Sequence, residues 1–381
     1  MASDQVYELR WGIISTGYIA SSFVKDLLVD PKTRDVHDVV HRIVAVGSRT
    51  VDSAQSFVDR HTLSDPEIKV YGSYDEVYAD TNVQAVYIGT PHTFHYENAL
   101  AAIKAKKHVL CEKPVTTNAA ELRALLSAAK ENSVFFMEAM WTRFQPLVRE
   151  VKRIAEQGEL GRPIVLHADL SGDFGIEKIP LTHRILDPKL GGGALLDLGP
   201  YPLVWAILAL YENPANNKAS PSSITGAMLK TPLTGVDSST VFTLTFDPTA
   251  SSESSPSSTL AAQAILSCSI TLNAPSPGVT IRFERGTITI DPPIYCPKSF
   301  KVVYANKGSK VATEGVLTRT YEYVGKGWHF QADEVARCIA AGKLESDLWG
   351  HDKSLLQMEI FDEVRKQGGY VLPPGVEKVT A

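Results

Sequence analysis

Hydrophobic and polar positions alternate in two different ways along the chain, and the change falls near residue 140. Before it, short Val- and Ile-rich runs alternate with stretches whose apolar residues recur at helical spacing. The apolar runs are LRWGII, HRIVAVGS, IKVYGS, VQAVYIGT, KHVLCEK and SVFFME. Strands that alternate with amphipathic helices form repeated βα units, so the pattern predicts a parallel sheet within residues 1–140. Asn118 and Glu121 predict a capping box at the start of one of these helices.

From Trp141 onward, strand-like runs follow one another with little helix between them. The pattern predicts a helix over about 145–157, then strands at PIVLHADL, STVFTLTF and VTIRFERGTITI, the last with Val279, Ile281 and Phe283 on one face. We therefore expect residues 141–327 to form a domain on an open, mostly antiparallel sheet that helices cover on one side. The Ser/Pro-rich segment 247–259 is expected to be a surface loop. Residues 328–381 contain two further helical patterns, which we expect to pack back on the first domain.

Length, charge and cysteine usage narrow the class of protein. A chain of 381 residues suggests two domains. A net charge of −5 with interleaved signs provides no basic block for nucleic acid or a membrane surface, which favours a small-molecule partner. Four cysteines lack metal or redox spacing and favour a reducing compartment. We find no signal-peptide pattern and no stretch approaching 18 apolar residues, so we expect a cytoplasmic protein.

The stretch GIISTGYIA follows the first predicted strand and opens a helix. The dinucleotide-binding pattern GxGxxG falls there on Ser15, Gly17 and Ala20. Gly17 is where the backbone approaches a pyrophosphate closely, and Ala20 is a permitted small residue where the helix packs on the strand. Taken alone, this degenerate match fits a plain strand-turn-helix equally well. The next strand ends in Ser48 and Arg49 without the acidic residue typical of NAD enzymes, and Arg49 favours a 2′-phosphate, hence NADP.

Two later strands end in residues that carry chemistry. His92 and His95 follow the fourth strand, but no third ligand is near in sequence, so we expect no metal site there. The fifth strand ends in Glu112, Lys113 and Pro114, at the edge of the sheet where open α/β proteins bind ligands. Lys113 is our candidate for a catalytic cation, and Pro114 restricts its backbone to extended geometry.

The segment GGGALLDLGPYPLVW places a carboxylate in apolar surroundings. Asp197 and Tyr201 are four residues apart and share a face if the segment is helical, although Pro200 must kink that helix or begin a new one. A buried carboxylate without a partner is costly. We expect Lys113 to be that partner.

Together these motifs resemble the family of glucose-fructose oxidoreductase and inositol dehydrogenase (Gfo/Idh/MocA) over nearly the whole chain. The match is closest to the branch of dimeric dihydrodiol dehydrogenase and fungal NADP-dependent D-xylose 1-dehydrogenase. The stretches that carry it are WGIISTGYIA, YGSYDEVYAD, YIGTPHTFHYENAL, VLCEKPVTTNAAE, FFMEAMWTRFQP, GGGALLDLGPYPLVW and ADEVARCIAAGKLES. The resemblance implies a Rossmann domain, a C-terminal α/β domain whose open sheet often forms a homodimer, and a nicotinamide in the cleft between the domains.

The resemblance also assigns roles to particular residues. It implies that Lys113, Asp197 and Tyr201 are catalytic, with Tyr201 at the position of the family's acid/base histidine. It implies that substrate contacts come from Trp141, Arg143 and Phe144. The cofactor site is expected to comprise Ser15, Thr16, Gly17, Tyr18, Ile19, Ser48, Arg49, Thr90, Pro91, His92, His95, Glu112 and Lys113.

These assignments predict an enzyme that oxidises an aldose, most simply D-xylose at C1, with hydride transfer to NADP and without a metal. Tyr201 would accept the hydroxyl proton, Lys113 would hold the oxygen, and Asp197 would orient the pair. Oxidation of a trans-dihydrodiol or of another sugar is the alternative chemistry. A non-catalytic sugar or dinucleotide sensor is the alternative of another class, and the presence of all three residues argues against it.

Overall fold

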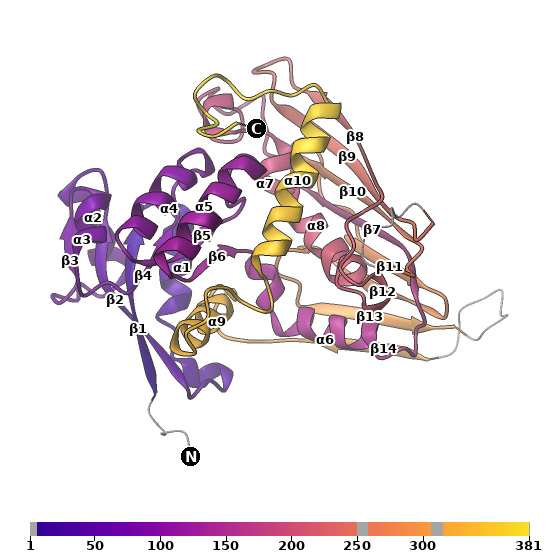
Figure 1. The fold of residues 1–381 in the computed structure, drawn as a ribbon, viewed down its shortest axis with the longest axis horizontal. Helices are drawn as coiled ribbons and strands as arrows, with labels where there is room; N and C mark the ends of the chain where they lie inside the picture. Colours follow the sequence, from indigo (N-terminus) through magenta and orange to yellow (C-terminus); the bar gives the residue numbers. More distant parts are fainter. Residues whose placement is uncertain (1–5, 250–257, 306–314, 381) are drawn as a thin grey trace. The chain divides into compact units, whose positions relative to one another are not determined.

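The computed structural model describes residues 6–249, 258–305 and 315–380, which fall into two compact units (Figure 1). The first unit comprises residues 1–144, 323–355 and 377–381, and the second comprises 145–322 and 356–376. The expected C-terminal segment 328–381 is thus divided between the two units. Most of the Ser/Pro-rich segment, residues 250–257, lies outside the described residues.

The first unit is built on a parallel sheet of six strands in the order β3-β2-β1-β4-β5-β6. Its strands are β1 (Tyr7–Ile14), β2 (Val39–Gly47), β3 (Lys69–Tyr71), β4 (Ala85–Ile88), β5 (His108–Glu112) and β6 (Phe136–Ala139). The strand order reverses between β1 and β4, which is the point where open α/β sheets bind ligands. The predicted Rossmann topology is confirmed.

The first unit contains the helices between these strands and one further helix, α9, later in the chain (Figure 1). They are α1 (Tyr18–Leu27), α2 (Val51–His61), α3 (Tyr74–Ala79), α4 (His95–Lys104), α5 (Ala119–Asn132) and, after the second unit, α9 (His329–Ala340), with 3₁₀ turns at Pro31–Arg34, His92–Phe94 and Trp141–Phe144. Asn118 caps α5 by accepting from the Glu121 N–H at 2.8 Å. Glu121 accepts from the N–H of Thr117 at 2.9 Å, one residue earlier than in the reciprocal capping box that the sequence predicts.

The second unit is built on one large sheet in the order β14-β13-β12-β11-β7-β10-β9-β8. Its strands are β7 (Pro163–Ser171), β8 (Ser223–Lys230), β9 (Asp237–Phe246), β10 (Ala262–Ser269), β11 (Val279–Phe283), β12 (Gly286–Ile290), β13 (Ser299–Tyr304) and β14 (Val316–Thr320). The β7–β10 pair is parallel and the other pairs are antiparallel, so the expected mostly antiparallel sheet is confirmed.

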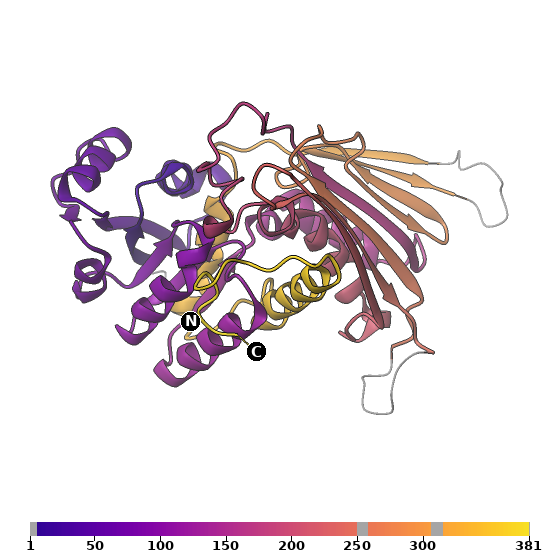
Figure 2. The ribbon, with the colours of Figure 1, turned by 90° about the horizontal axis from the view of Figure 1, so that it is seen from above.

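Helices cover one face of this sheet (Figure 2). They are α6 (Pro146–Glu156), α7 (Ala194–Leu198), α8 (Pro200–Ala206), the π-helix Ile207–Tyr211 and the greater part of α10 (His351–Gln367), with 3₁₀ turns at Pro188–Leu190 and Pro214–Asn216. Val279, Ile281 and Phe283 are all buried, as their shared face predicts. Phe361 of α10 packs edge-on against Phe242 of β9, with ring centroids 6.3 Å apart.

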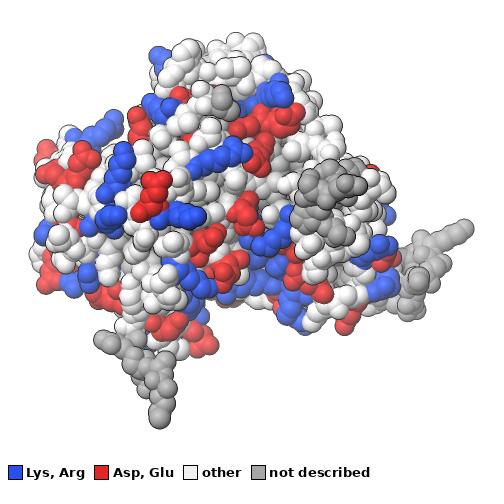
Figure 3. All heavy atoms as spheres, viewed as in Figure 1, with Lys and Arg blue, Asp and Glu red and all other residues white. Residues whose placement is uncertain are grey.

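One described segment, Pro188–Tyr211, is long and apolar enough to cross a membrane by length and composition. This corrects the expectation that no stretch approaches 18 apolar residues. Its most apolar part is entirely buried inside the protein, as the core helix of a folded domain is. On the face drawn in Figure 3, acidic and basic side chains are interspersed, in keeping with the mixed signs of the sequence.

Candidate active site

The turn after β1 keeps the backbone of a glycine turn although its first residue is a serine. Ser15 has a φ of 92°, in the region that glycine adopts at little cost. Its hydroxyl oxygen accepts a hydrogen bond from the Gly17 N–H at 3.2 Å. That bond offsets part of the strain of about 1–3 kcal/mol that a side chain incurs in this region. The serine therefore preserves the turn geometry that the glycine pattern implies.

The protein's own packing does not require a glycine at position 17. The φ of Gly17 is −78°, which any residue adopts. Of the described atoms beyond its chain neighbours, a Cβ built there would approach the Ser15 hydroxyl alone, at an ordinary 3.5 Å. At Gly89, after β4, a Cβ would instead lie 2.9 Å from the Tyr87 ring. Gly17 thus leaves room for the close approach of a group from outside the chain, as a pyrophosphate requires.

Helix α1 begins directly after this turn. Gly17 is its N-cap and supplies no side chain to the first backbone N–H groups. Tyr18 is 78 % exposed, whereas Ile19 lies against the end of β4, 3.3 Å from a Cβ built on Gly89. Because unpaired N–H groups and the helix dipole both favour negative charge, this helix start suits a phosphate.

The turn after β2 lies beside the first turn. Thr16 and Ser48 are joined by a hydroxyl hydrogen bond of 3.0 Å, and Ser48 is buried. Arg49 is exposed, and its guanidinium makes no hydrogen bond or ion pair with the described part of the chain. It lies near Tyr74, where burial raises the pKa of the phenol and the Arg49 charge opposes that rise. An exposed guanidinium at this strand end fits the 2′-phosphate of NADP.

His95 ties the loop after β4 to the turn after β5. Its ring nitrogens lie 2.8 Å from the carbonyl oxygen of Thr90 and 2.9 Å from that of Pro114. Burial lowers the pKa of His95 to about 4, so the ring carries one proton at neutral pH. A neutral ring has one N–H and donates to one of these two carbonyl oxygens, and the ring is 1 % exposed, so His95 packs between the two loops inside the protein. His92 precedes it by one helical turn and, with Pro91, is more exposed.

Lys113 follows β5 on a closely held turn. Glu112, at the end of the strand, accepts from the Tyr87 hydroxyl at 2.7 Å and from the Lys113 N–H at 3.2 Å. Burial raises the pKa of Glu112 to about 7, while the positive charge of Lys113 opposes the rise. The Lys113–Pro114 bond is cis and Lys113 is half-buried. The strand end thus presents an amine beside a carboxyl group that changes charge near neutral pH.

Glu138 supports the same turn and was missed by sequence reasoning. It is 1 % exposed in β6 and accepts from the Val115 N–H at 3.1 Å. It also accepts from the Trp349 indole at 3.0 Å and the Ser354 hydroxyl at 2.7 Å. An acidic residue inside the apolar run SVFFME was the available signal, because a buried carboxylate needs partners.

The three expected substrate residues lie together on the 3₁₀ turn after β6. Trp141, Arg143 and Phe144 are 3 %, 2 % and 0 % exposed. The Trp141 ring stacks on that of Trp328, with centroids 4.2 Å apart and planes inclined by 10°. A role in substrate binding stays a prediction for all three.

In the second unit, the glycine run before α7 is explained by Asp237, another residue that the sequence reasoning missed. Gly193 has a φ of 117°, and a Cβ there would lie 2.0 Å from an Asp237 carboxylate oxygen. Asp237 accepts from the Leu195 N–H at 2.8 Å and the Thr240 hydroxyl at 2.7 Å. Burial raises the pKa of Asp237 to about 6. This carboxyl group therefore holds the start of the helix that carries Asp197.

Asp197 and Tyr201 occupy two successive short helices. Pro200 begins α8, which is one of the two outcomes that the sequence allows. Asp197 lies 3.0 Å from the guanidinium of Arg184, which the sequence analysis did not single out. The Tyr201 ring lies 5.5 Å from the Tyr295 ring, centroid to centroid. The pairing of Asp197 with Lys113 stays a prediction.

Within the first unit, the expected cofactor residues gather at one edge of the sheet. Those at 15–19, 48–49, 90–92 and 112–113 lie at or just after the carboxyl ends of β1, β2, β4 and β5, which are neighbouring strands. This edge contains the switch point between β1 and β4.

Comparisons with known proteins agree with this architecture. Residues 9–140 match the model of an oxidoreductase family with an NAD-binding Rossmann fold, and residues 148–289 match the Gfo/Idh/MocA C-terminal domain. The chain is 38 % identical to a D-xylose 1-dehydrogenase (NADP⁺) of Hypocrea jecorina over 98 % of its own length and 95 % of that protein. It is 34 % identical to a trans-1,2-dihydrobenzene-1,2-diol dehydrogenase of Danio rerio, over 95 % and 98 %.

Solved structures share the fold at lower identity. A levoglucosan dehydrogenase in complex with NADH and levoglucosan superposes with a TM-score of 0.77 at 18 % identity, over 95 % of this chain and 97 % of that one. KijD10, a 3-ketoreductase of Actinomadura kijaniata in complex with NADP, gives 0.73 at 20 % identity, over 94 % and 98 %. With both halves of the chain matched, and relatives above 30 % identity over nearly its full length, this protein belongs to the Gfo/Idh/MocA oxidoreductase family.

Proposed function

We propose that this protein is an NADP-dependent dehydrogenase that oxidises an aldose, with D-xylose at C1 as the favoured substrate. The relative from Hypocrea jecorina carries that activity in its name. One structural observation carries the proposal. The open turn at Gly17 and the braced amine of Lys113 follow strands β1 and β5, which both pair with β4 in parallel, so they lie at the same sheet edge. That edge offers an anion site and a cation to one bound molecule.

The residues at this edge fit NADP. The space at Gly17 and the uncapped start of α1 would receive the pyrophosphate, and Arg49 would pair with the 2′-phosphate. NADP bound there would supply the hydride acceptor for the substrate carbon.

Residues of the protein itself would remove the proton of the substrate hydroxyl. Tyr201 takes the proton of the substrate hydroxyl as general base. Lys113 donates a hydrogen bond to the same oxygen, and its charge favours the phenolate form of the tyrosine. Asp197, held by Arg184, orients the reacting groups.

The direct test follows NADPH formation by absorbance with D-xylose, other aldoses and a trans-dihydrodiol. Tyr201→Phe is expected to lower kcat by about 10²- to 10⁴-fold, the range for loss of a general base, with NADPH affinity unchanged. Tyr304→Phe in β13 is the matched control and should behave as wild type. Tight NADPH binding without oxidation of any substrate would favour a sensor, and turnover with the diol alone would favour the alternative chemistry that the Danio rerio relative's name suggests.

We also propose that the protein is a homodimer through the outer face of the large sheet. Ile164, Val241 and Ile265 point to that face and are 45 %, 46 % and 40 % exposed. Ile265→Lys should yield monomers by sedimentation, because a buried unpaired ammonium is costly in a dimer interface. Thr243→Lys should weaken the same dimer, since Thr243 pairs with Ile265. Exposed Lys104 on α4 of the first unit offers the control position, where Lys104→Ala should leave the dimer intact.

A further inference from the structure

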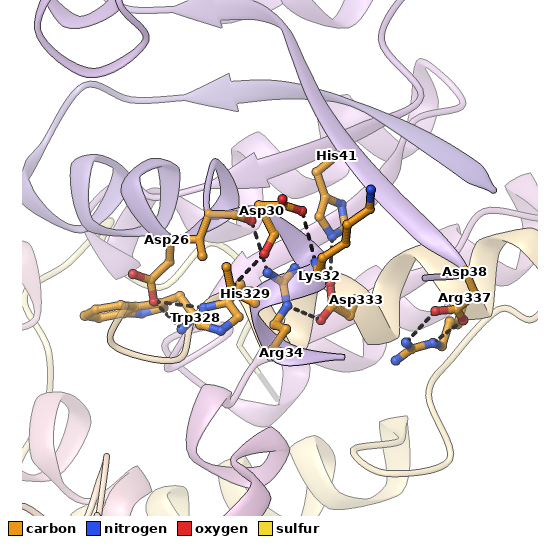
Figure 4. A network of polar contacts seen from close by, with 12 residues as sticks. Asp26, Asp30, Lys32, Arg34, Asp38, His41, Trp328, His329, Asp333 and Arg337 are labelled. Atoms are coloured by element: carbon orange, nitrogen blue, oxygen red, sulfur yellow. Dashed lines mark hydrogen bonds and ion pairs between the residues drawn. The ribbon is translucent and has the colours of Figure 1, made fainter. Parts of the chain in front are cut away.

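A carboxylate on α1 holds the loop that leads into α9. Asp26 is 4 % exposed and accepts hydrogen bonds from three consecutive backbone N–H groups. Their distances are 2.9 Å from Lys326, 2.6 Å from Gly327 and 2.8 Å from Trp328. The His329 ring nitrogen Nδ1 lies 3.3 Å from the same carboxylate (Figure 4). Trp328 is the N-cap of α9, so Asp26 holds the N–H of the N-cap residue and the two N–H groups that precede it.

The loop is shaped around this carboxylate. Gly325 and Gly327 have φ values of 85° and 107°, which glycine adopts without strain. A Cβ on Gly325 would lie 2.7 Å from an Asp26 oxygen. Burial raises the pKa of Asp26, but the hydrogen bonds from His329 and the backbone outweigh it, and the pKa lies below its usual value. Asp26 is therefore a charged group around which the glycine-containing loop packs closely.

The anchored loop ends in Trp328, whose ring stacks on Trp141. The centroids are 4.2 Å apart and the planes are inclined by 10°. The Trp328 indole N–H has no acceptor among the described residues. The position of this ring therefore depends on its stack and on the backbone that Asp26 holds.

Trp328 covers one face of Trp141, so no ligand can stack on that face of the ring. We propose that Trp328 and Asp26 are positioning residues that fix the plane of Trp141 and with it the fit of a sugar ring. This inference rests on the proposed function, because it takes Trp141 as a substrate contact. Through Asp26 and Trp328, helix α1, which begins at the proposed cofactor turn, is linked to Trp141.

The test separates sugar binding from cofactor binding. Trp328→Ala is expected to raise the KM for the sugar by about three- to tenfold, the range of an aromatic pair, with kcat and the KM for NADP within twofold of wild type. Trp328→Phe keeps an aromatic face and should restore most of the sugar KM. Asp26→Asn should raise the sugar KM in the same direction, because it removes the charge that holds three N–H groups.

The matched control is Asp333→Asn, which loosens the same helix at another anchor. Asp333 holds Arg34 and His41 and makes no ring contact with Trp141 or Trp328. If Asp333→Asn raises the sugar KM as much as Trp328→Ala, or if Trp328→Ala leaves it unchanged in an active enzyme, the inference is overturned and the proposed function stands.

A crystal structure of Trp328→Ala gives a readout that does not depend on activity. A Trp141 ring that leaves its wild-type plane supports the positioning role, and a ring that stays in place overturns it. Wild-type protein that oxidises no sugar or diol would instead refute the proposed function, and the ring position would still decide the role of Trp328.

Discussion

The two ends of the parallel sheet in the first unit treat polar side chains in opposite ways. At the amino end, the bidentate Arg34–Asp333 pair, with 2.7 Å bonds, is completed by His41 at 3.0 Å from the same carboxylate (Figure 4). Trp11 donates to the other nitrogen of His41 at 3.2 Å, which fixes that ring as neutral. At the carboxyl end, Gly17 leaves open space and Arg49 is exposed.

The pKa shifts follow the same division. Burial alone would raise the pKa of Asp333, but the bonds from Arg34 and His41 outweigh it and lower the pKa to about 2. Burial raises the pKa of Glu112, at the carboxyl end, to about 7, with less compensation. Buried charged groups whose hydrogen bonds and ion pairs outweigh the cost of burial stabilise the fold. Groups whose burial is not fully offset by such partners are available for binding and chemistry. Variants at the two ends should therefore affect different properties.

Two lysines that flank β5 give the sharpest test of this contrast. Lys113→Met should lower kcat/KM by about 10²- to 10⁴-fold, because it removes the cation at the reacting oxygen, and should lower the free energy of unfolding by less than the loss of Lys107 does. Steady-state kinetics and urea unfolding measure the two effects.

Lys107→Met, before the same strand, is the matched control. The Lys107 ammonium donates to the carbonyl oxygens of Asp80 at 2.7 Å and Val83 at 2.8 Å. Losing it removes the donor of the buried Val83 carbonyl and one of the donors of the Asp80 carbonyl, which keeps the Val83 N–H at 3.2 Å. The fold should lose about 1–3 kcal/mol of stability, with kcat/KM of the folded protein unchanged. If Lys113→Met loses as much stability as Lys107→Met, the two ends of the sheet do not differ in their contribution to stability.

Gly17→Ala gives a smaller effect of the same kind. We expect NADP affinity to fall by about ten- to a hundredfold, or roughly 1.4–2.8 kcal/mol, because the added methyl group occupies the approach to the turn. The melting temperature without cofactor should stay within about 2 °C, since the site accepts a Cβ. Calorimetric titration with NADP measures the first effect.

Gly89→Ala is the contrasting variant, because its Cβ would lie 2.9 Å from the Tyr87 ring. It should lose stability as well as affinity. A Gly17→Ala protein that binds NADP normally would show that the open space at this turn has no role in cofactor binding.

The elements of this fold follow from short-range patterns, and the site follows from them only in part. The apolar runs locate all six parallel strands, and strand ends locate Gly17, Arg49 and Lys113 because parallel strands share a carboxyl edge. Glu138, Arg184 and Asp237 escape such reasoning. Their partners are the Val115 N–H, Asp197 and the Leu195 N–H, which lie 13–42 positions away in the chain or on other elements.

The glycine run at 191–193 shows the same limit. Its pattern indicates close approach, but only the fold shows that the approaching group is the Asp237 carboxylate. The Arg34–Asp333 pair joins residues 299 positions apart and has no local signal. A residue's role is predictable when the element that carries it also sets its surroundings.

The pH dependence of stability gives the smallest and most specific effect. The folded-state pKa of Glu112 is raised to about 7, so the native protein binds this proton more tightly than the unfolded chain does. Its contribution is fully present below the ordinary pKa of a glutamate and is lost as the pH rises towards 7 and above. Between about pH 5 and about pH 8, the free energy of unfolding of the wild type should therefore fall by about 1–2 kcal/mol more than that of Glu112→Gln.

Urea unfolding of both proteins across that range measures the difference. Asp333→Asn should show the opposite sign, because a lowered pKa contributes stability that is present above the ordinary aspartate pKa and lost as the pH falls towards about 2. Parallel curves for wild type and Glu112→Gln would mean that the carboxyl end compensates its buried acid as fully as the amino end does. The raised pKa would then no longer distinguish the functional edge of the sheet from the structural one, and Lys113 would lose the titrating neighbour that the geometry gives it.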